Sequence, residues 1–301
     1  MTVKGKNANI SKLKKLRGKN LCFLLKKIVK GNRKMKKIIT LLLSIVLCFA
    51  SLISFSSCGE DDAIYVNTNA FFAPFEYYDG TEIKGVDIDI MNLVGEKLGK
   101  KVVVKNTDFE LIIDNVASGK QFDCGAAGLT ILPEREALVD FSIPYFTSKQ
   151  YVIFKSGTIS KTGTSADGED YVLWETLAGL TIGVQTDTTG DIQVGDQIDS
   201  GALKDKGSEK KQYASANLAS DALGLYVDAV VVDQLPAEFI VSKNAGLECL
   251  AVYIDQNTAT IEQYAICVNK NLPDLLKAIN EVLTELGEEG VNALVKKHLG
   301  L

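Results

Sequence analysis

The chain has only one histidine, one tryptophan and five prolines in 301 residues, so several common kinds of active site have little to build on. The histidine, His298, lies in the last amphipathic segment, where we expect a surface position. No nucleophile stands beside a base, and no group of His, Cys, Asp and Glu has the spacing of a metal site. We therefore predict a protein that is not an enzyme, with no catalytic residue, no metal and no other cofactor.

Acidic residues are absent from the first 57 positions, and the first one is Glu60. Fourteen of the 33 Lys and Arg lie in this stretch, which leaves 19 against all 38 Asp and Glu in the remainder. The remainder therefore carries about 19 net negative charges, compared with 5 for the whole chain. A body this acidic argues against nucleic acid as a partner, because phosphate binding needs clustered Lys and Arg.

Residues 35–57 have the three parts of an export signal. Two lysines precede the apolar run 38–50, and small residues lead up to Cys58. The segment resembles a bacterial lipoprotein signal, cleaved before Cys58 so that the new N-terminal cysteine carries lipid such as palmitate. Phe55 stands where such signals usually have Leu. An uncleaved membrane helix fits the length but leaves the Ser-Ser-Cys-Gly ending unexplained. We predict an extracytoplasmic protein anchored to the outer face of the cell membrane.

The start of the chain can be interpreted in two ways. Met35 is the natural start if residues 1–34 are an upstream extension from a mis-called start codon. Alternatively, Met1 is the start and residues 1–34 form a long basic leader. Neither interpretation places a folded domain there, and residues 58–62 are expected to be the lipidated N-terminus and a linker.

The part after Cys58 has about 240 residues, enough for two modest lobes. Short apolar runs alternate with amphipathic stretches, which is typical of an α/β fold. Gly-, Ser- and Thr-rich or polar stretches predict surface loops at 157–170 and 200–211. We expect strands at 63–66, 101–105, 122–127, 150–154, 180–184 and 229–232, and helices at 87–98, 111–118 and, as two helices, 272–299.

Three cysteines remain in this part: Cys124, Cys249 and Cys267. Their number is odd and their spacing is unlike that of a metal site. All three lie in apolar runs, so we expect buried thiols, and nothing in the sequence supports a bridge between Cys249 and Cys267.

Several motifs in a fixed order carry a resemblance to a known family. They are GVDIDI at 85–90, AAGLTILPER at 126–135, VDFSIPY at 139–145, VQTDTTG at 184–190 and DAVVVD at 228–233. Together they resemble the polar-amino-acid branch of the bacterial solute-binding proteins, the receptors of ABC importers. The resemblance covers nearly all of residues 63–301.

The resemblance implies an α/β fold of the two-lobed Venus-flytrap kind, the type II periplasmic binding protein architecture. Each lobe would be a β-sheet flanked by helices. Residues 63–146 and 265–301 would form one lobe, and residues 150–259 the other. Segments 145–149 and 260–264 would cross between the lobes as a hinge.

The resemblance also implies how a free amino acid would be held. Arg135 would bind its carboxylate, with help from the Thr130 N–H and from Thr189 at a helix N-terminus. Asp233 would bind the ammonium group, together with the Gly128 carbonyl and the Thr130 hydroxyl. The alternatives are a solvated Arg135 paired with a neighbouring Glu, and an Asp233 that only caps its helix.

Further positions would contact the rest of the ligand. Phe72 and Phe109 would sandwich it, unless they are plain core residues, and Asn69 and Gln185 would reach its side chain. Thr188 belongs to the predicted site, with helix capping as its alternative role. Asn69 departs from the Asp that is frequent in the family, which favours a polar uncharged or sulfur-containing amino acid over a basic one.

The sequence also departs from the family at Asp187, where Gly is frequent. The predicted partners are a free amino acid, a membrane permease with its ATPase, and the membrane itself, and the chain is expected to be a monomer. Two other functions are possible on the same fold: a periplasmic dehydratase and a ligand-sensing receptor domain.

Overall fold

The computed structural model describes residues 63–301. The predicted signal, the linker and the lipid site at Cys58 lie outside the described residues. Within 63–301, no helix has both the length and the apolar character needed to cross a bilayer.

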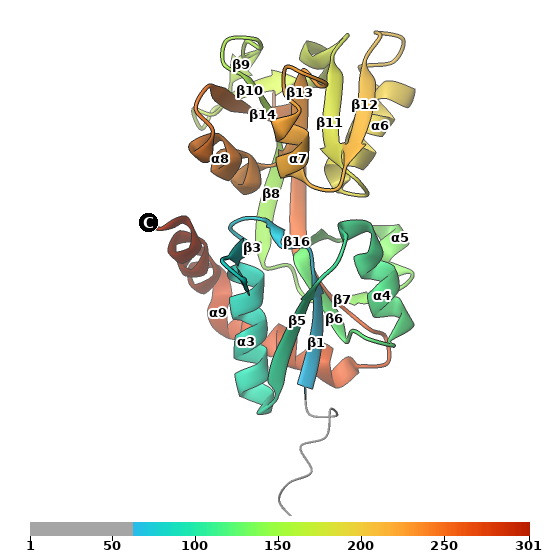
Figure 1. Cartoon of the computed structure of the whole chain (residues 1–301), viewed down its shortest axis with the longest axis vertical. Coiled ribbons are helices and arrows are strands. Elements are labelled where there is room, and N and C mark those ends of the chain that lie inside the picture. Colours follow the sequence, from blue (N-terminus) through green and yellow to red (C-terminus); the bar gives the residue numbers. More distant parts are fainter. Residues whose placement is uncertain (1–62) are drawn as a thin grey trace, which may run out of the picture. The chain divides into compact units, whose positions relative to one another are not determined.

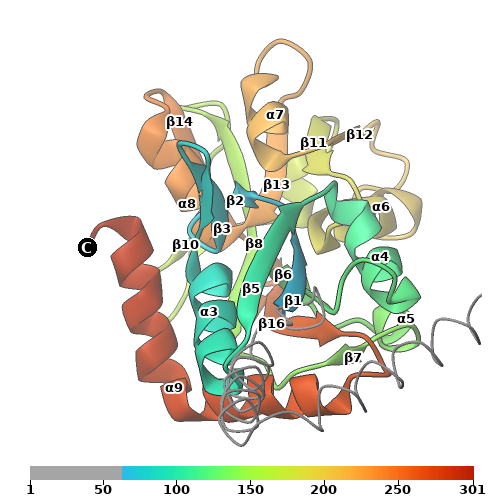
Figure 2. The same cartoon turned by 60° about the horizontal axis from the view of Figure 1, so that its bottom comes forward.

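The first lobe is built on strands β1, β5 and β6, which run parallel, with β16 antiparallel to β6. The apolar side chains on one face of β1, β6 and β16 pack with α3 and α9 in one cluster, and those on the other face of β6 and β16 pack with α4 in another. Figure 2 shows α3 and α9 on one side of these strands and α4 on the other. The elements of this lobe are β1 (Ala63–Thr68), α3 (Val86–Leu98), β5 (Lys101–Asn106), η2 (Phe109–Leu111), α4 (Ile112–Ser118), β6 (Cys124–Thr130), α5 (Pro133–Glu136), β7 (Asp140–Phe141) and α9 (Pro273–Leu299).

The second lobe repeats this plan. Strand β11 lies between β12 and β13, parallel to both, and β13 is antiparallel to β8. Its apolar residues form two clusters, one around α7 and α8 and one around α6 and η3. The elements are β9 (Gly163–Thr164), β10 (Asp170–Leu173), η3 (Trp174–Leu177), β11 (Thr181–Gln185), α6 (Thr189–Asp199), β12 (Glu209–Tyr213), α7 (Ala216–Asp221), β13 (Ala229–Asp233), α8 (Gln234–Lys243), β14 (Leu247–Asp255) and β15 (Thr258–Ala259).

Two long strands connect the lobes, β8 (Phe146–Lys155) and β16 (Ile261–Val268) (Figure 1). They pair antiparallel where they cross, from Tyr264 opposite Phe146 to Ile261 opposite Lys149. Beyond this paired segment, β8 enters the sheet of the second lobe and β16 enters that of the first. The structure therefore has the predicted α/β class, with two lobes and two crossings.

A small antiparallel sheet was not predicted from the sequence. It consists of β2 (Phe71–Phe72), β3 (Glu76–Asp79) and β4 (Glu82–Lys84). The chain then turns into α3 through Gly85, whose φ is 140°. A Cβ on this residue would lie 1.9 Å from the Phe75 carbonyl oxygen, so only glycine fits. This tight turn keeps the small sheet against the first lobe.

The C-terminal stretch was predicted as two helices, and α9 has a break that accounts for them. Gly287 lies inside α9 with φ 57° and ψ −175°, which is not a helical conformation. Glycine adopts a positive φ without a steric penalty, so the chain can change direction here and continue as a second helical piece. The polar stretch 200–211, predicted as a loop, extends into β12 at Glu209.

Candidate functional site

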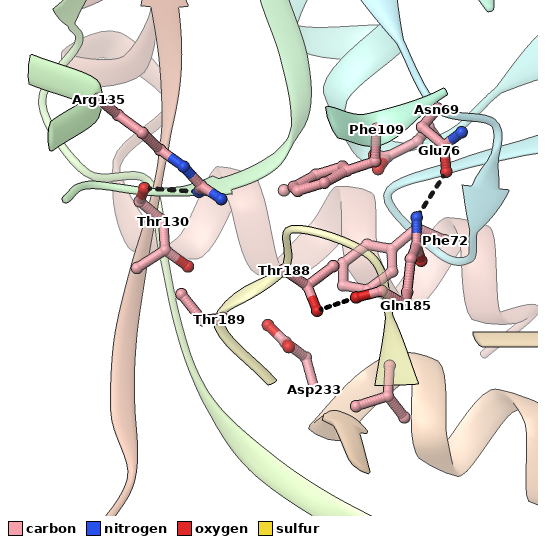
Figure 3. Close-up of a pocket in the computed structure, with 12 residues that line it drawn as sticks. Asn69, Phe72, Glu76, Phe109, Thr130, Arg135, Gln185, Thr188, Thr189 and Asp233 are labelled. Carbon is pink, nitrogen blue, oxygen red and sulfur yellow. Dashed lines mark hydrogen bonds between the residues drawn. The ribbon is translucent and has the colours of Figure 1, made fainter. Parts of the chain in front are cut away.

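One cavity brings together the ten residues that the sequence marked for ligand contact. Its lining comprises Asn69, Phe72, Glu76, Phe109, Gly128, Thr130, Arg135, Gln185, Thr188, Thr189, Val232 and Asp233, which are drawn as sticks in Figure 3. Glu76 and Val232 are the two members that the sequence did not mark. The residues come from both lobes, and several follow or end parallel strands, the usual place for ligands in open α/β sheets.

Arg135 contributes a buried guanidinium to this cavity. The side chain is in α5, is 5% exposed, and donates to the Thr130 carbonyl at 3.1 Å and to the Asp187 carbonyl at 2.7 Å. Its guanidinium carbon lies 5.6 Å from the centre of the Phe109 ring. No carboxylate within residues 63–301 lies at salt-bridge distance from it, so its charge is free to pair with an anion. Burial lowers the pKa of Arg135, but guanidinium stays charged in proteins.

The start of α6 lines the cavity through Thr188 and Thr189. Thr188 is the N-cap, and its hydroxyl accepts from the Asp191 N–H at 3.3 Å and donates to the Gln185 carbonyl at 2.8 Å. Asp187 just before it has φ 62°, the left-handed region that asparagine and aspartate tolerate better than most residues. The turn is therefore kept despite the departure from glycine. A helix N-terminus is a favourable place for an anion.

Asp233 ends β13 and supplies the opposite charge from the other lobe. It stands at the N-cap of α8, but its side chain makes no capping bond. The carboxylate instead accepts from Gln150 Nε2 at 2.6 Å and from the Tyr264 hydroxyl, and the residue is 5% exposed. Burial and the neighbouring Glu262 raise the pKa of Asp233 well above its usual range. A cation bound in the cavity would stabilise the ionised carboxylate and so lower the pKa of Asp233 again.

Two aromatic rings form walls of the cavity. Phe109 is 9% exposed and also packs with the apolar cluster around α4, so it is both core and wall. Phe72 is half-buried, with its ring centre 6.2 Å from that of Tyr264. Gly128, with φ 54°, lies against it, and a Cβ there would lie 2.8 Å from a Phe72 ring carbon. Glycine at this position lets the ring approach the backbone.

Asn69 and Gln185 contact each other across the lobes. Gln185 Nε2 donates to Asn69 Oδ1 at 3.0 Å, and Asn69 Nδ2 donates to the Thr107 carbonyl at 2.8 Å. Part of the hydrogen-bonding capacity of both side chains is therefore used within the protein. Each still lines the cavity.

Glu76 is the lining residue that the sequence reasoning missed. It is fully buried, and neither carboxylate oxygen has a hydrogen-bond partner within the described residues. Burial first, and then the nearby Asp87, raise the pKa of Glu76 well above its usual range. The only signal in the sequence was an acidic residue directly after the apolar run 71–75. A buried acceptor of this kind is costly unless something pairs with it.

Asp87 stands behind Glu76 and Gly128. It accepts from the Gly128 N–H at 2.9 Å and from the Tyr145 hydroxyl at 2.5 Å. Burial raises the pKa of Asp87 to about 6, although these two bonds act in the opposite direction. Its bond to the Gly128 N–H holds β6 where Gly128 lines the cavity.

The single histidine lies apart from this lining. His298 Nε2 is 2.8 Å from an Asp89 carboxylate oxygen, and Nδ1 is 3.0 Å from the Tyr77 hydroxyl. No grouping of three or more His, Cys, Asp and Glu in residues 63–301 has the arrangement of a metal site.

Comparison with known proteins identifies the family. The model of the bacterial extracellular solute-binding proteins, family 3, matches residues 64–300, most of the chain. The chain belongs to this family. The resemblance drawn from its motifs is thereby confirmed.

Individual known proteins are similar to most of this chain. The arginine-binding extracellular protein ArtP of Bacillus subtilis is 26% identical, over 87% of this chain and 97% of ArtP. The arginine-bound form of truncated ArgBP from T. maritima is 30% identical with a TM-score of 0.63, covering 75% of this chain and 97% of that one. An ancestral arginine-binding protein bound to glutamine is 31% identical with a TM-score of 0.65, covering 80% and 99%. These structures share the two-lobed type II fold.

Proposed function

We propose that this chain is the extracytoplasmic substrate-binding component of an ABC importer, which captures a free amino acid between its lobes and delivers it to a membrane permease. The observation that carries the proposal is the pair of Arg135 and Asp233, a buried cation and a buried carboxylate that line one cavity from opposite lobes. An α-amino acid has the complementary pair of charges. Charge-assisted hydrogen bonds to buried partners are among the stronger interactions available to a protein.

Closure of the lobes is part of the proposal. The ligand would first bind the lobe that carries Arg135 and Phe72, and closure would then add Asp233 and Thr189. The ligand stabilises the closed form because it interacts with both sets only there. A thermal-shift screen of the twenty standard amino acids and cystine tests the function. We expect one or a few of them to raise the melting temperature, and no shift with any of them would contradict the proposal.

The residues near the cavity also bear on which kind of side chain the ligand has. The neutral Asn69 and Gln185 predicted an uncharged ligand, but Glu76 is buried and its carboxylate has no hydrogen-bond partner within residues 63–301, which favours a cation. We propose a basic amino acid, with L-arginine as the first candidate. The arginine-binding relatives support this choice.

Replacing Glu76 by glutamine is expected to weaken L-arginine binding by about 10- to 100-fold, the value of a hydrogen bond to a charged group. Isothermal titration at pH 7.5 measures the change. Glu76→Gln should weaken binding of L-glutamine, if the wild type binds it, much less than binding of L-arginine. The matched control is Glu82→Gln in β4, where the same change is made at an exposed carboxylate. Equal arginine affinity in the wild type and Glu76→Gln would contradict the choice of a cation.

The same titration has an expected pH dependence. Without ligand, the pKa of Glu76 is raised, and a bound guanidinium would lower it. Arginine binding should therefore release a proton, and affinity should fall as the pH falls through the raised pKa. Titrations in buffers with different ionisation enthalpies detect this proton.

We propose that the chain is held at the membrane by lipid on Cys58 and that it binds without turnover. Labelled palmitate should enter the wild type but not Cys58→Ala, with Cys249→Ala as a control that keeps the label. Label in Cys58→Ala would contradict the anchor.

A further inference from the structure

Glu262 lies in the crossing strand β16, close to the cavity but outside its lining. It is 4% exposed and stands opposite Ser148 of β8, where the two crossing strands pair. Nothing in the sequence marked it beyond its place in a hinge segment. Its carboxylate, however, contacts both lobes.

The carboxylate of Glu262 accepts four hydrogen bonds, two at each oxygen. Oε2 accepts from the Thr130 hydroxyl at 2.9 Å and from the Thr189 hydroxyl at 2.6 Å. Oε1 accepts from Gln150 Nε2 at 2.8 Å and from Gln193 Nε2 at 3.0 Å. The two hydroxyls belong to opposite lobes, and both residues line the cavity.

These contacts determine what the two hydroxyls can offer to a ligand. A hydroxyl has one hydrogen, and an ionised carboxylate has none to give, so with Glu262 ionised each threonine donates its hydrogen to Oε2. Only oxygen lone pairs are then left for the cavity. Thr130 and Thr189 can therefore accept a hydrogen bond from a cation but cannot donate one to an anion.

Gln150 extends the same arrangement to Asp233. Its Nε2 group has two hydrogens and makes short contacts with Glu262 Oε1 at 2.8 Å and with Asp233 Oδ1 at 2.6 Å. The amide therefore holds both carboxylates with their acceptor atoms in place. Asp233 and the two hydroxyls then present hydrogen-bond acceptors to the cavity.

We propose that Glu262 is a positioning residue for the ligand's ammonium group: it turns the hydroxyls of Thr130 and Thr189 into acceptors without touching the ligand. The proposal rests on the proposed function, amino acid capture. A glutamine at this position would disturb the arrangement in either orientation of its amide. Its NH₂ group would either face the donors Gln150 and Gln193, or donate to the threonines and turn their hydrogens into the cavity.

The test combines a change in the protein with a change in the probe. Isothermal titration compares wild type and Glu262→Gln with L-arginine and with 5-guanidinopentanoate, which has hydrogen in place of the α-ammonium group. If L-arginine gives no thermal shift, L-glutamine and its deaminated analogue replace this pair. We expect Glu262→Gln to weaken amino acid binding by about 10- to 100-fold, but binding of the deaminated analogue by less than about threefold.

Two results would overturn the proposal. One is unchanged affinity of Glu262→Gln for the amino acid. The other is an equal loss for both probes, which would indicate a merely structural role. Glu248→Gln, the same change at an exposed position of β14, is the matched control. If Glu262→Gln does not fold, as judged by its melting curve, Gln193→Ala takes its place, because it removes one of the four hydrogen bonds to Glu262. It should also weaken binding of the amino acid more than binding of the deaminated analogue, but with a smaller loss. Failure of amino acid capture itself is distinguishable, because the wild type would then bind none of the probes.

Discussion

Replacing Arg135 by alanine is expected to weaken amino acid binding by roughly 10²- to 4 × 10³-fold, the largest loss of any single change at the cavity. The ligand carboxylate would be buried opposite Asp233 without its cation, and removing one partner of a buried pair costs about 3–5 kcal/mol. Hydrogen bonds to the Thr130 carbonyl of its own lobe and to the Asp187 carbonyl of the other lobe hold the Arg135 guanidinium at the cavity. Isothermal titration with the amino acid found in the thermal-shift screen measures the loss.

The control for Arg135→Ala is Arg135→Lys. Lysine keeps the charge but lacks the planar fork that pairs with both carboxylate oxygens, so we expect an intermediate affinity. The melting temperatures of the ligand-free variants show whether the fold is intact. Wild-type affinity in folded Arg135→Ala would mean that the carboxylate binds elsewhere.

Replacing Asp233 by asparagine is expected to weaken binding by about 30- to 4 × 10³-fold, since truncating one partner of a buried charge pair costs about 2–5 kcal/mol. The amide has nearly the same shape but carries no charge to balance the ammonium group. Titration against the same amino acid tests this, with Asp221→Asn at the exposed end of α7 as the matched control. An unchanged affinity would assign the ammonium group to another partner.

The same variant should be more stable than the wild type when no ligand is bound. Burial and Glu262 raise the folded-state pKa of Asp233, so its ionised form opposes folding. For a carboxyl with a raised folded-state pKa, the folded state binds the extra proton, and stability falls as the pH rises from the unfolded-state pKa, about 4, towards the raised pKa. The wild type should therefore lose stability as the pH rises above about 4, and Asp233→Asn should lose less. Melting curves across this range check the sign.

Much of the fold could be predicted from the sequence because its signals are local. The buried strand predicted at 180–184 is β11, Thr181–Gln185, and the helix predicted at 87–98 is α3, Val86–Leu98. Local signals are weaker where a short strand is half polar. The small sheet β2–β3–β4 was missed because its strands are only 2 to 4 residues long.

The candidate site also contains residues that were predicted from the sequence and residues that were missed. Ten residues taken from the family resemblance line one cavity, and their contact with a ligand remains a prediction. Glu76 and Glu262 were not predicted because their environment depends on distant residues. Glu262 meets Thr130, which is 132 positions away, and Gln150, which is 112 positions away. No local pattern reveals that a charged residue is buried among such partners.

The most direct test is a crystal structure of the chain with the amino acid selected by the thermal-shift screen. The predicted result is one amino acid enclosed between the lobes, with its carboxylate on Arg135 and its ammonium group on Asp233 and on the hydroxyls of Thr130 and Thr189. A ligand bound in the reverse orientation, or outside this cavity, would contradict it.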